Sequence, residues 1–266
     1  MLMAMTGRRI RMTIKDLHDF FNSFLKIEDF PADPSMNGIQ IQNSAPDTKP
    51  IEKVAFAVDA CEQTALLAAE SGASALVVHH GLFWGHCQTL TGSHFRRVSV
   101  FLKNDLALLA YHIPLDANNP CGNNFSLAAK LGLSDTECFG TWHGMTIGVK
   151  GVLSSSLSAD ELKDRVAEIT KADCRAFCFG REKIRTVGII SGGAGEDVNQ
   201  AVEQNLDAYI TGEFAHEQYH FARESEINVI AGGHYGTEIL GVMQLKEKVE
   251  RELGLQTIFI DVPTNL

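Results

Sequence analysis

Short apolar runs alternate with stretches of helical spacing along most of this chain. An unbroken apolar run such as residues 75–78 is typical of a strand buried on both faces, whereas apolar residues three or four positions apart predict an amphipathic helix. The first half predicts helices at about 14–27, 62–71 and 94–103, and strands near 39–42, 53–58, 75–79 and 106–111. The second half predicts helices at about 159–170, 196–205, 215–225 and 238–253, and strands near 174–178, 185–190, 208–211, 227–231 and 256–260. This alternation of strands with helices predicts an α/β fold with mainly parallel sheets.

The second half of the chain contains a diverged copy of the first, displaced by 133 residues. Residues 51–57 align with residues 184–190, and the register then continues without a gap, so that Ala75 aligns with Ala208. Any two strand–helix–strand units share some pattern, but the gapless register favours a true duplication. We therefore predict two similar α/β lobes that face each other, with a ligand site in the cleft between them.

The predicted lobes are residues 13–139 and 140–266, and the loosest stretch, residues 140–151, marks the boundary. The C-terminal segment of the second lobe is a candidate to pack on the first. Residues 1–12 carry three arginines and lack the apolar centre of a secretory signal, so we interpret them as a disordered leader.

Composition narrows the class of protein. The chain has 266 residues, 45% of them hydrophobic, and a net charge of −10, which disfavours nucleic acid and anionic membranes as general partners. Its six cysteines form neither Cys-x-x-Cys pairs nor a disulfide framework, and no apolar run approaches the roughly 20 residues that span a bilayer. These features together predict a cytoplasmic protein that takes a small-molecule substrate.

Histidines and carboxylates gather at the ends of three predicted strands. His79 and His80 end one strand, and a His-x-x-x-acid element follows each of two others, at residues 112–116 and 234–238. Side chains at successive strand positions point to opposite faces, but at the strand end Gly81 gives the backbone freedom for both histidines to reach one site. Each histidine alone has an ordinary explanation as a core or surface residue. The recurrence of the His-x-x-x-acid element favours a metal site.

The pattern predicts a pair of divalent metal ions per chain. The candidate ligands are His79, His80, Asp116, His234 and Glu238. Imidazole and carboxylate ligands suit Zn, Mn, Fe, Co or Ni, and the lack of thiolate argues against a closed zinc–cysteine site. Five ligands for two ions leave coordination positions open, which is typical of catalytic rather than structural sites.

Two further residues are candidates for proton transfer. His112 begins one His-x-x-x-acid element and is interpreted as a residue that orients a ligand or moves protons rather than as a metal ligand. Glu213 occupies the position equivalent to His80 in the repeat, and it is either a cleft acid or a carboxylate at a helix start. The glycine-rich segment 191–195 favours a tight strand-to-helix turn over an anion site.

Short motifs between residue 13 and the C-terminus stand out from the α/β background. They are NGIQ at 37–40, VVHHG at 77–81, HIPLDA at 112–117, GNN at 122–124, TGE at 211–213, GHYGTE at 233–238 and FIDVP at 259–263. In combination they resemble the type 2 GTP cyclohydrolase I homologues, also called Nif-three-like dinuclear metal proteins. The resemblance implies the two-lobed Nif-three-like fold, a dinuclear site on the five candidate ligands, GTP cyclohydrolase activity and a homo-oligomer, a hexameric trimer of dimers.

Two functions of different classes fit these observations. The first is a metal-dependent hydrolase of the GTP cyclohydrolase type, in which hydroxide held by a metal attacks a nucleotide or related substrate while His112 or Glu213 moves protons. The second is a protein without catalytic activity, which binds metal or nucleotide as a scaffold, a regulator or a carrier that delivers metal. A fold shared with enzymes does not decide between them.

Overall fold

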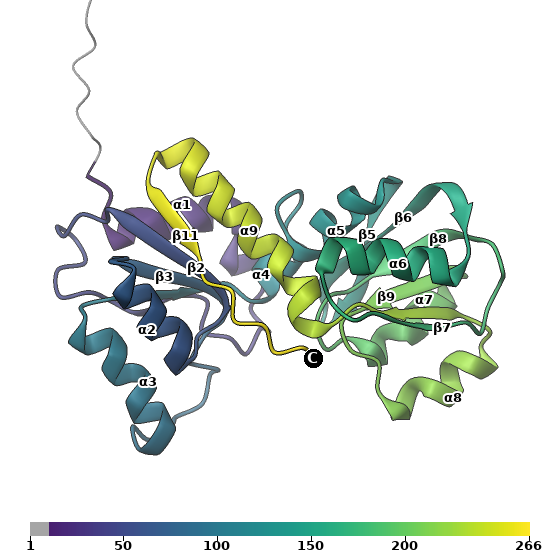
Figure 1. Cartoon of the computed structure of the whole chain (residues 1–266), viewed down its shortest axis with the longest axis horizontal. Helices are drawn as coiled ribbons and strands as arrows, with labels where there is room; N and C mark the ends of the chain where they lie inside the picture. The colour runs from purple at the N-terminus through teal and green to yellow at the C-terminus, as the bar shows by residue number, and fades with distance from the viewer. Residues whose placement is uncertain (1–10) are drawn as a thin grey trace, which may run out of the picture.

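The structure of the chain, a computed structural model, describes residues 11–266. It has two α/β lobes side by side, each built around its own β-sheet (Figure 1). The predicted α/β class and two-lobed organisation are therefore confirmed. Ten of the twelve residues of the predicted leader lie outside the described residues. Within residues 11–266, no helix has both the length and the apolar character that crossing a membrane requires.

The first lobe contains a five-stranded sheet in the order β1-β4-β3-β2-β11. Its strands are β1 (Gly38–Ile41), β2 (Lys53–Asp59), β3 (Ala75–His80), β4 (Ala107–Ala110) and β11 (Gln256–Phe259). All neighbouring strands are parallel except β1, which is antiparallel to β4. Side chains alternate along β2, so that Val54 and Phe56 enter the core on one face while Ala55 and Ala57 enter the core on the other. The continuous apolar runs thus reflect a sheet that is buried on both faces.

Helices cover both faces of this sheet. They are α1 (Ile14–Leu25), α2 (Glu62–Glu70) and α3 (Gly92–Lys103), followed by the short α4 (Ile113–Ala117), and a 3-10 turn, η1 (Ile27–Asp29), follows α1. Helix α1 packs on one face, and α2 and α3 pack on the other. The start of α1 is fixed by a capping box, because the Thr13 hydroxyl accepts from the Asp16 amide at 3.2 Å and the Asp16 carboxylate accepts from the Thr13 amide at 2.8 Å.

The second lobe contains a six-stranded sheet in the order β5-β6-β8-β9-β10-β7. Its strands are β5 (Leu133–Trp142), β6 (Met145–Leu157), β7 (Arg175–Phe177), β8 (Ile184–Ile189), β9 (Ala208–Thr211) and β10 (Asn228–Ala231). Its helices are α5 (Asn123–Leu131), α6 (Ala159–Thr170), α7 (Val198–Glu203) with the preceding 3-10 turn η2 (Gly195–Asp197), and α8 (His216–Glu224). The long helix α9 (His234–Leu253) then runs from the second lobe to the first, where β11 joins the first sheet (Figure 1).

The duplication seen in the sequence is also present in the strand pairing. Val54 is paired with Ala75 in the first sheet, and the residues 133 positions later, Val187 and Ala208, are paired in the second. Strand β7 lies antiparallel beside β10 in the second sheet, as β1 lies antiparallel beside β4 in the first. Equivalent strands therefore end at equivalent places in the two lobes.

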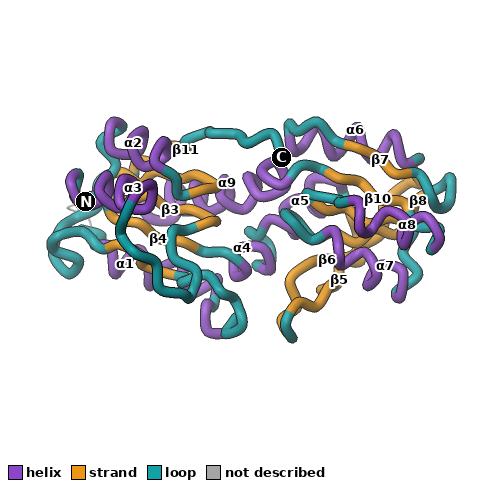
Figure 2. The backbone as a smooth tube through the Cα atoms, turned by 90° about the horizontal axis from the view of Figure 1, so that it is seen from below, coloured by secondary structure: helices purple, strands orange, loops and turns teal. Residues whose placement is uncertain are grey.

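The segment from β5 to β6 differs from the sequence-based expectation. Residues 140–151 were expected to be the loosest stretch, whereas β5 and β6 form an antiparallel hairpin that extends beyond the rest of the second lobe (Figure 2). Most β5 side chains are exposed, so no apolar alternation marks the strand in the sequence. The predicted boundary at residue 140 consequently falls inside β5. Helices α4 and α5 were not among the predicted elements.

Candidate metal centre

The carboxyl ends of equivalent strands from both sheets border a single cavity between the lobes. The cavity has a volume of about 580 Å³, and its lining includes residues that end or follow β3 and β4 in the first lobe and β8, β9 and β10 in the second. Ligands commonly bind at the carboxyl ends of parallel strands in α/β sheets. Because the lobes are copies of each other, two such edges contribute to one site.

His79 lies at the centre of the site and is fully buried. Its Nδ1 lies 3.0 Å from the carbonyl oxygen of Tyr111, which can only accept, so Nδ1 carries the proton and donates it. This hydrogen bond directs the Nε2 atom to a point 3.5 Å from Oε1 of Glu238 and 3.6 Å from Oδ2 of Asp116. The tautomer leaves the Nε2 lone pair available to a cation.

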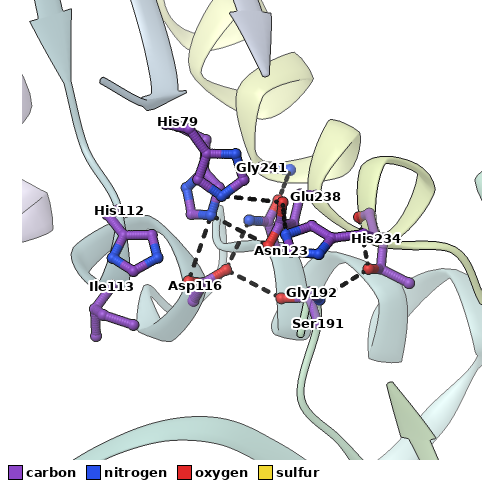
Figure 3. Close-up of polar contacts among 12 residues, drawn as sticks. His79, His112, Ile113, Asp116, Asn123, Ser191, Gly192, His234, Glu238 and Gly241 are labelled. Atoms are coloured by element: carbon purple, nitrogen blue, oxygen red, sulfur yellow. Dashed lines mark hydrogen bonds and ion pairs between the residues drawn. The ribbon is translucent and has the colours of Figure 1, made fainter. Parts of the chain in front are cut away.

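Glu238 lies between two groups of imidazoles. Its Oε1 faces His79, whereas its Oε2 lies 3.3 Å from Nε2 of His80 and 3.2 Å from Nε2 of His234. His234 and Glu238 occupy the first turns of α9 at positions i and i+4, which places both side chains on one face of the helix. Figure 3 shows His79 of β3, Asp116 of α4, and His234 and Glu238 of α9 pointing toward one another.

Two of these imidazoles are oriented by carboxylates that accept a hydrogen bond from Nδ1, the ring nitrogen that does not face Glu238. Nδ1 of His80 donates to Asp59 at 2.8 Å, and Nδ1 of His234 donates to Glu213 at 2.6 Å. In both cases Nε2 is the nitrogen that points to Glu238. Metal-bound histidines in proteins are usually held in this way, through a hydrogen bond from the nitrogen that does not bind the ion.

His112 is held by the same kind of contact. Its Nδ1 donates to Asp33 at 2.8 Å, and its backbone amide donates to the side-chain oxygen of Asn37 at 2.8 Å. The ring of His112 lies 5.1 Å from the ring of His79 and 5.7 Å from that of His80, measured between centroids. His112 therefore belongs to the site, beside the imidazoles predicted to bind metal.

Asp116 is fixed by a buried polar network. Its Oδ1 accepts from the side-chain amide of Asn123 at 2.8 Å and from the Ser191 hydroxyl at 3.0 Å, which leaves Oδ2 to face His79 (Figure 3). Asn123 also accepts from the backbone amide of Gly241 at 2.7 Å, and Asn124 accepts from that of Ser191 at 2.7 Å. The network joins α4, α5, α9 and the loop after β8, so it ties both lobes to the site.

The side chains of the site fit divalent ions. Three groups of potential ligand atoms each lie within 4.8 Å of one another: His79, Asp116 and Glu238; His80, His234 and Glu238; and His79, His80 and His112. Within residues 11–266, Nε2 of His79 and Oε2 of Glu238 are buried without a hydrogen-bond partner. Because an unpaired buried polar atom is costly, these atoms fit a site that binds a cation. The site thus contains His/Asp/Glu clusters that can hold metal.

The close contacts shift the pKa values of the ligands. Burial alone would lower the pKa of His79, but the charges of Asp116 and Glu238 outweigh it and raise that pKa to about 10. Burial would also lower the pKa of His234, but its contacts with Glu238, and to a smaller extent with Glu213, raise that pKa to about 9. Burial favours the neutral form of Glu238, yet the charges of His79 and His80 hold its pKa well below the usual range.

Metal uptake is therefore expected to release protons. At pH 7.5 the metal-free protein carries protons on both His79 and His234, because their pKa values of about 10 and about 9 lie above that pH. A cation bound at Nε2 must displace both protons, so affinity falls as the pH is lowered. Calorimetric titration of the metal-free protein with Zn²⁺ in two buffers of different ionisation enthalpy measures the number released. Release of fewer than one proton per chain would contradict the assigned protonation states.

The glycine-rich segment forms a tight turn against Glu238. The amide of Gly192 donates to the Thr237 hydroxyl at 3.0 Å, and its carbonyl accepts from the Glu213 amide at 2.9 Å, so the segment acts as a turn. Gly192 has a φ of +68°, and a Cβ atom there would overlap Oε1 of Glu238. Both facts require glycine at this position.

Gly192→Ala is expected to lower the free energy of unfolding by about 1–3 kcal/mol, through its positive φ, and to displace Glu238. Gly193→Ala is the matched control, because the nearest atom to its added Cβ is Cε1 of His234 at an ordinary 3.6 Å. Urea unfolding and elemental analysis of both variants measure the two effects. Equal stability and equal metal content in the two variants would exclude this role of Gly192.

The structure brings the seven candidate residues to one site, but the sequence analysis did not identify Asp59 and Asp33, which hydrogen-bond to two of them. All five predicted ligands, together with His112 and Glu213, lie at the cavity or within ion-pair distance of its residues. Asp59 directly follows the strand predicted at 53–58, so its position was a usable signal, whereas Asp33 lies in an irregular loop that gave no such signal. His216 is exposed at the start of α8 and is not among the cavity-lining residues.

Comparisons with known proteins identify the family of the chain. The model of the family described as Duf34/NIF3 (NGG1p interacting factor 3) matches residues 12–266. Two curated relatives are named "GTP cyclohydrolase 1 type 2 homolog": one from Treponema pallidum, 39% identical over 96% of this chain and 100% of its own length, and one from Deinococcus radiodurans, 41% identical over 94% of each chain.

Two solved structures have the same fold. The crystal structure of TTHA1606 from Thermus thermophilus superposes with a TM-score of 0.85 at 34% identity, over 96% of this chain and 100% of that one. The structure of protein ybgI superposes with a TM-score of 0.88 at 29% identity, over the same shares of the two chains. The family resemblance noted in the sequence is confirmed, and the chain belongs to the Duf34/NIF3 family.

Proposed function

We propose that this chain is a hydrolase that depends on two divalent metal ions and acts on a nucleotide or a related small molecule. The observation that carries the proposal is the position of Glu238, whose Oε1 faces His79 and whose Oε2 faces His80 and His234. A carboxylate placed in this way suits a pair of ions. The name shared by the curated relatives supports the GTP cyclohydrolase type of reaction.

The proposed ligands divide into two sets that share Glu238. His79 and Asp116 would hold one ion with Oε1 of Glu238, and His80 and His234 would hold the other with Oε2. Divalent ions bound there supply Lewis acidity, which polarises a substrate and makes water a nucleophile near neutral pH. Which of Zn, Mn, Fe, Co or Ni is bound depends on the availability of each metal as much as on these ligands.

His112 and Glu213 differ in their proposed roles. His112 lines the cavity, and Asp33 fixes its Nδ1, so Nε2 is the atom that would take up or release a proton. Glu213 hydrogen-bonds to His234, which makes it a positioning residue for a metal ligand. That Glu213 itself moves protons stays a prediction.

Turnover by the metal-loaded protein tests the proposal. GTP would be assayed for formate release, and a panel of phosphoesters and amides would be assayed for hydrolysis. Activity should disappear with chelator and return with metal, and His112→Gln should lower it by about 100-fold or more with both ions retained. His216→Ala, at an exposed histidine of α8, is the control variant.

Two ions per chain with no turnover on any substrate would exclude the hydrolase. That result would leave the non-catalytic function, a protein that binds metal or nucleotide as a scaffold, a regulator or a carrier that delivers metal. The hexameric trimer of dimers implied by the family resemblance also stays a prediction, which light scattering in solution tests.

A further inference from the structure

Both tryptophans of the chain line the cavity. Trp84 follows β3 in the first lobe, and its ring centroid lies 5.0 Å from that of His112 and 6.1 Å from that of His80. Trp142 is the last residue of β5 in the second lobe, in the hairpin that projects beyond that lobe (Figure 2). Each lobe thus contributes one half-buried indole to the same site.

The single polar group of the Trp84 ring is already used within the protein. Its Nε1 donates to the carbonyl oxygen of Gly81 at 3.1 Å. The indole therefore offers carbon surface rather than a hydrogen-bond donor to whatever occupies the cavity. Ile113, Ile147 and Ile190 add apolar lining next to the tryptophans. An aromatic ligand gains most from such a surface.

The polar lining of the cavity is acidic. Besides the proposed ligands Asp116 and Glu238, the lining contains Asp59, Glu196, Asp197 and Glu213. Neither lysine nor arginine occurs among the described residues that line it. Proteins that recognise phosphate groups do so mainly with arginine, lysine or an ordered run of backbone amides. The loop after β8 does not supply such a run, because the Gly192 amide is bonded to Thr237.

We propose that the cavity binds a planar nitrogen heterocycle with N–H donors, uncharged or cationic, against Trp84 and Trp142, and that its lining outside the metal ligands recognises no phosphate group. The carboxylates of Glu196 and Asp197 can only accept hydrogen bonds when ionised, which matches amino and ring N–H groups. The proposal rests on the proposed function, since the ring would lie beside the metal ligands.

The two tryptophans make this proposal directly measurable, because they are the whole source of the indole fluorescence of the chain. Guanosine and GTP are the probes, added to the metal-free protein, because bound divalent ions would themselves attract phosphate. Guanosine should quench the emission, and GTP should bind at least about tenfold more weakly because its phosphates meet the carboxylates of the lining and neither lysine nor arginine. Trp84→Leu and Trp142→Leu should each weaken guanosine binding by about tenfold, whereas Trp84→Phe and Trp142→Phe should retain most of it.

The charge of the lining is tested separately. Glu196→Gln should narrow the difference in affinity between guanosine and GTP, whereas Glu203→Gln, an exposed acid at the end of α7, should leave it unchanged. Tighter binding of GTP than of guanosine, or no quenching by guanosine at millimolar concentration, would overturn the proposal. Ring binding without turnover would reject the hydrolase alone, whereas turnover of a substrate that lacks such a ring, without quenching, would reject this proposal alone.

Discussion

Glu238→Gln is expected to remove both metal ions from the protein. Each oxygen of Glu238 lies within 3.5 Å of an imidazole nitrogen from a different group, so one substitution affects both proposed ion sites. An amide keeps the shape of the side chain but removes its charge and one of its acceptors. The loss of affinity for each ion should exceed the roughly 10- to 100-fold loss that is typical when a residue that hydrogen-bonds to a metal ligand is replaced.

Elemental analysis and calorimetric titration measure this loss directly. Two ions per chain are expected in the unaltered protein and none in Glu238→Gln. The matched control is Glu247→Gln, an exposed glutamate on the same helix α9. Asp59→Asn should have an intermediate effect, because Asp59 only orients His80. Full metal content in Glu238→Gln would rule out a shared carboxylate.

The positions of the predicted ligands could be read from the sequence because strand ends and helix starts are local features. His79 and His80 end an apolar run, and each His-x-x-x-acid element follows a predicted strand. The structure begins α9 at His234 rather than at the predicted residue 238, which places His234 and Glu238 on one helix face. The duplication supplied the remaining step, since a pseudo-twofold arrangement brings equivalent strand ends together. Local pattern and internal symmetry thus sufficed for the candidate ligands and the two-lobed fold.

The supporting residues could not be predicted in the same way. Asp33 contacts His112 across 79 residues of sequence, from a loop whose composition gives no sign of it. Asn123 and Asn124 are fully buried, yet asparagine is ordinarily a surface residue, and only the completed network explains their burial. The hairpin of β5 and β6 lacked an apolar alternation because most of β5 is exposed. These features depend on tertiary contacts rather than on local pattern.

Removal of the metal is expected to destabilise the protein strongly. An ion at a thousand times its Kd stabilises the folded chain by about 4 kcal/mol, provided that it binds the folded state alone. For a chain of this size that free energy corresponds to about 10 °C in Tm. Calorimetry of the protein with and without chelator measures the difference. His79→Ala is the informative variant, since its Tm should respond far less to chelator if His79 binds metal.

The difference in Tm between the metal-loaded and the metal-free protein should widen as the pH rises from 6 to 9. In the metal-free protein the pKa of His79 is raised to about 10 and that of His234 to about 9, so protonation of these groups stabilises the fold fully below about pH 6.5. That contribution is lost progressively as the pH rises through 9 and 10. The metal-loaded protein does not depend on these protons, and its affinity for metal increases as they leave. A difference that stays constant or shrinks over this range would show that His79 and His234 do not exchange protons for metal.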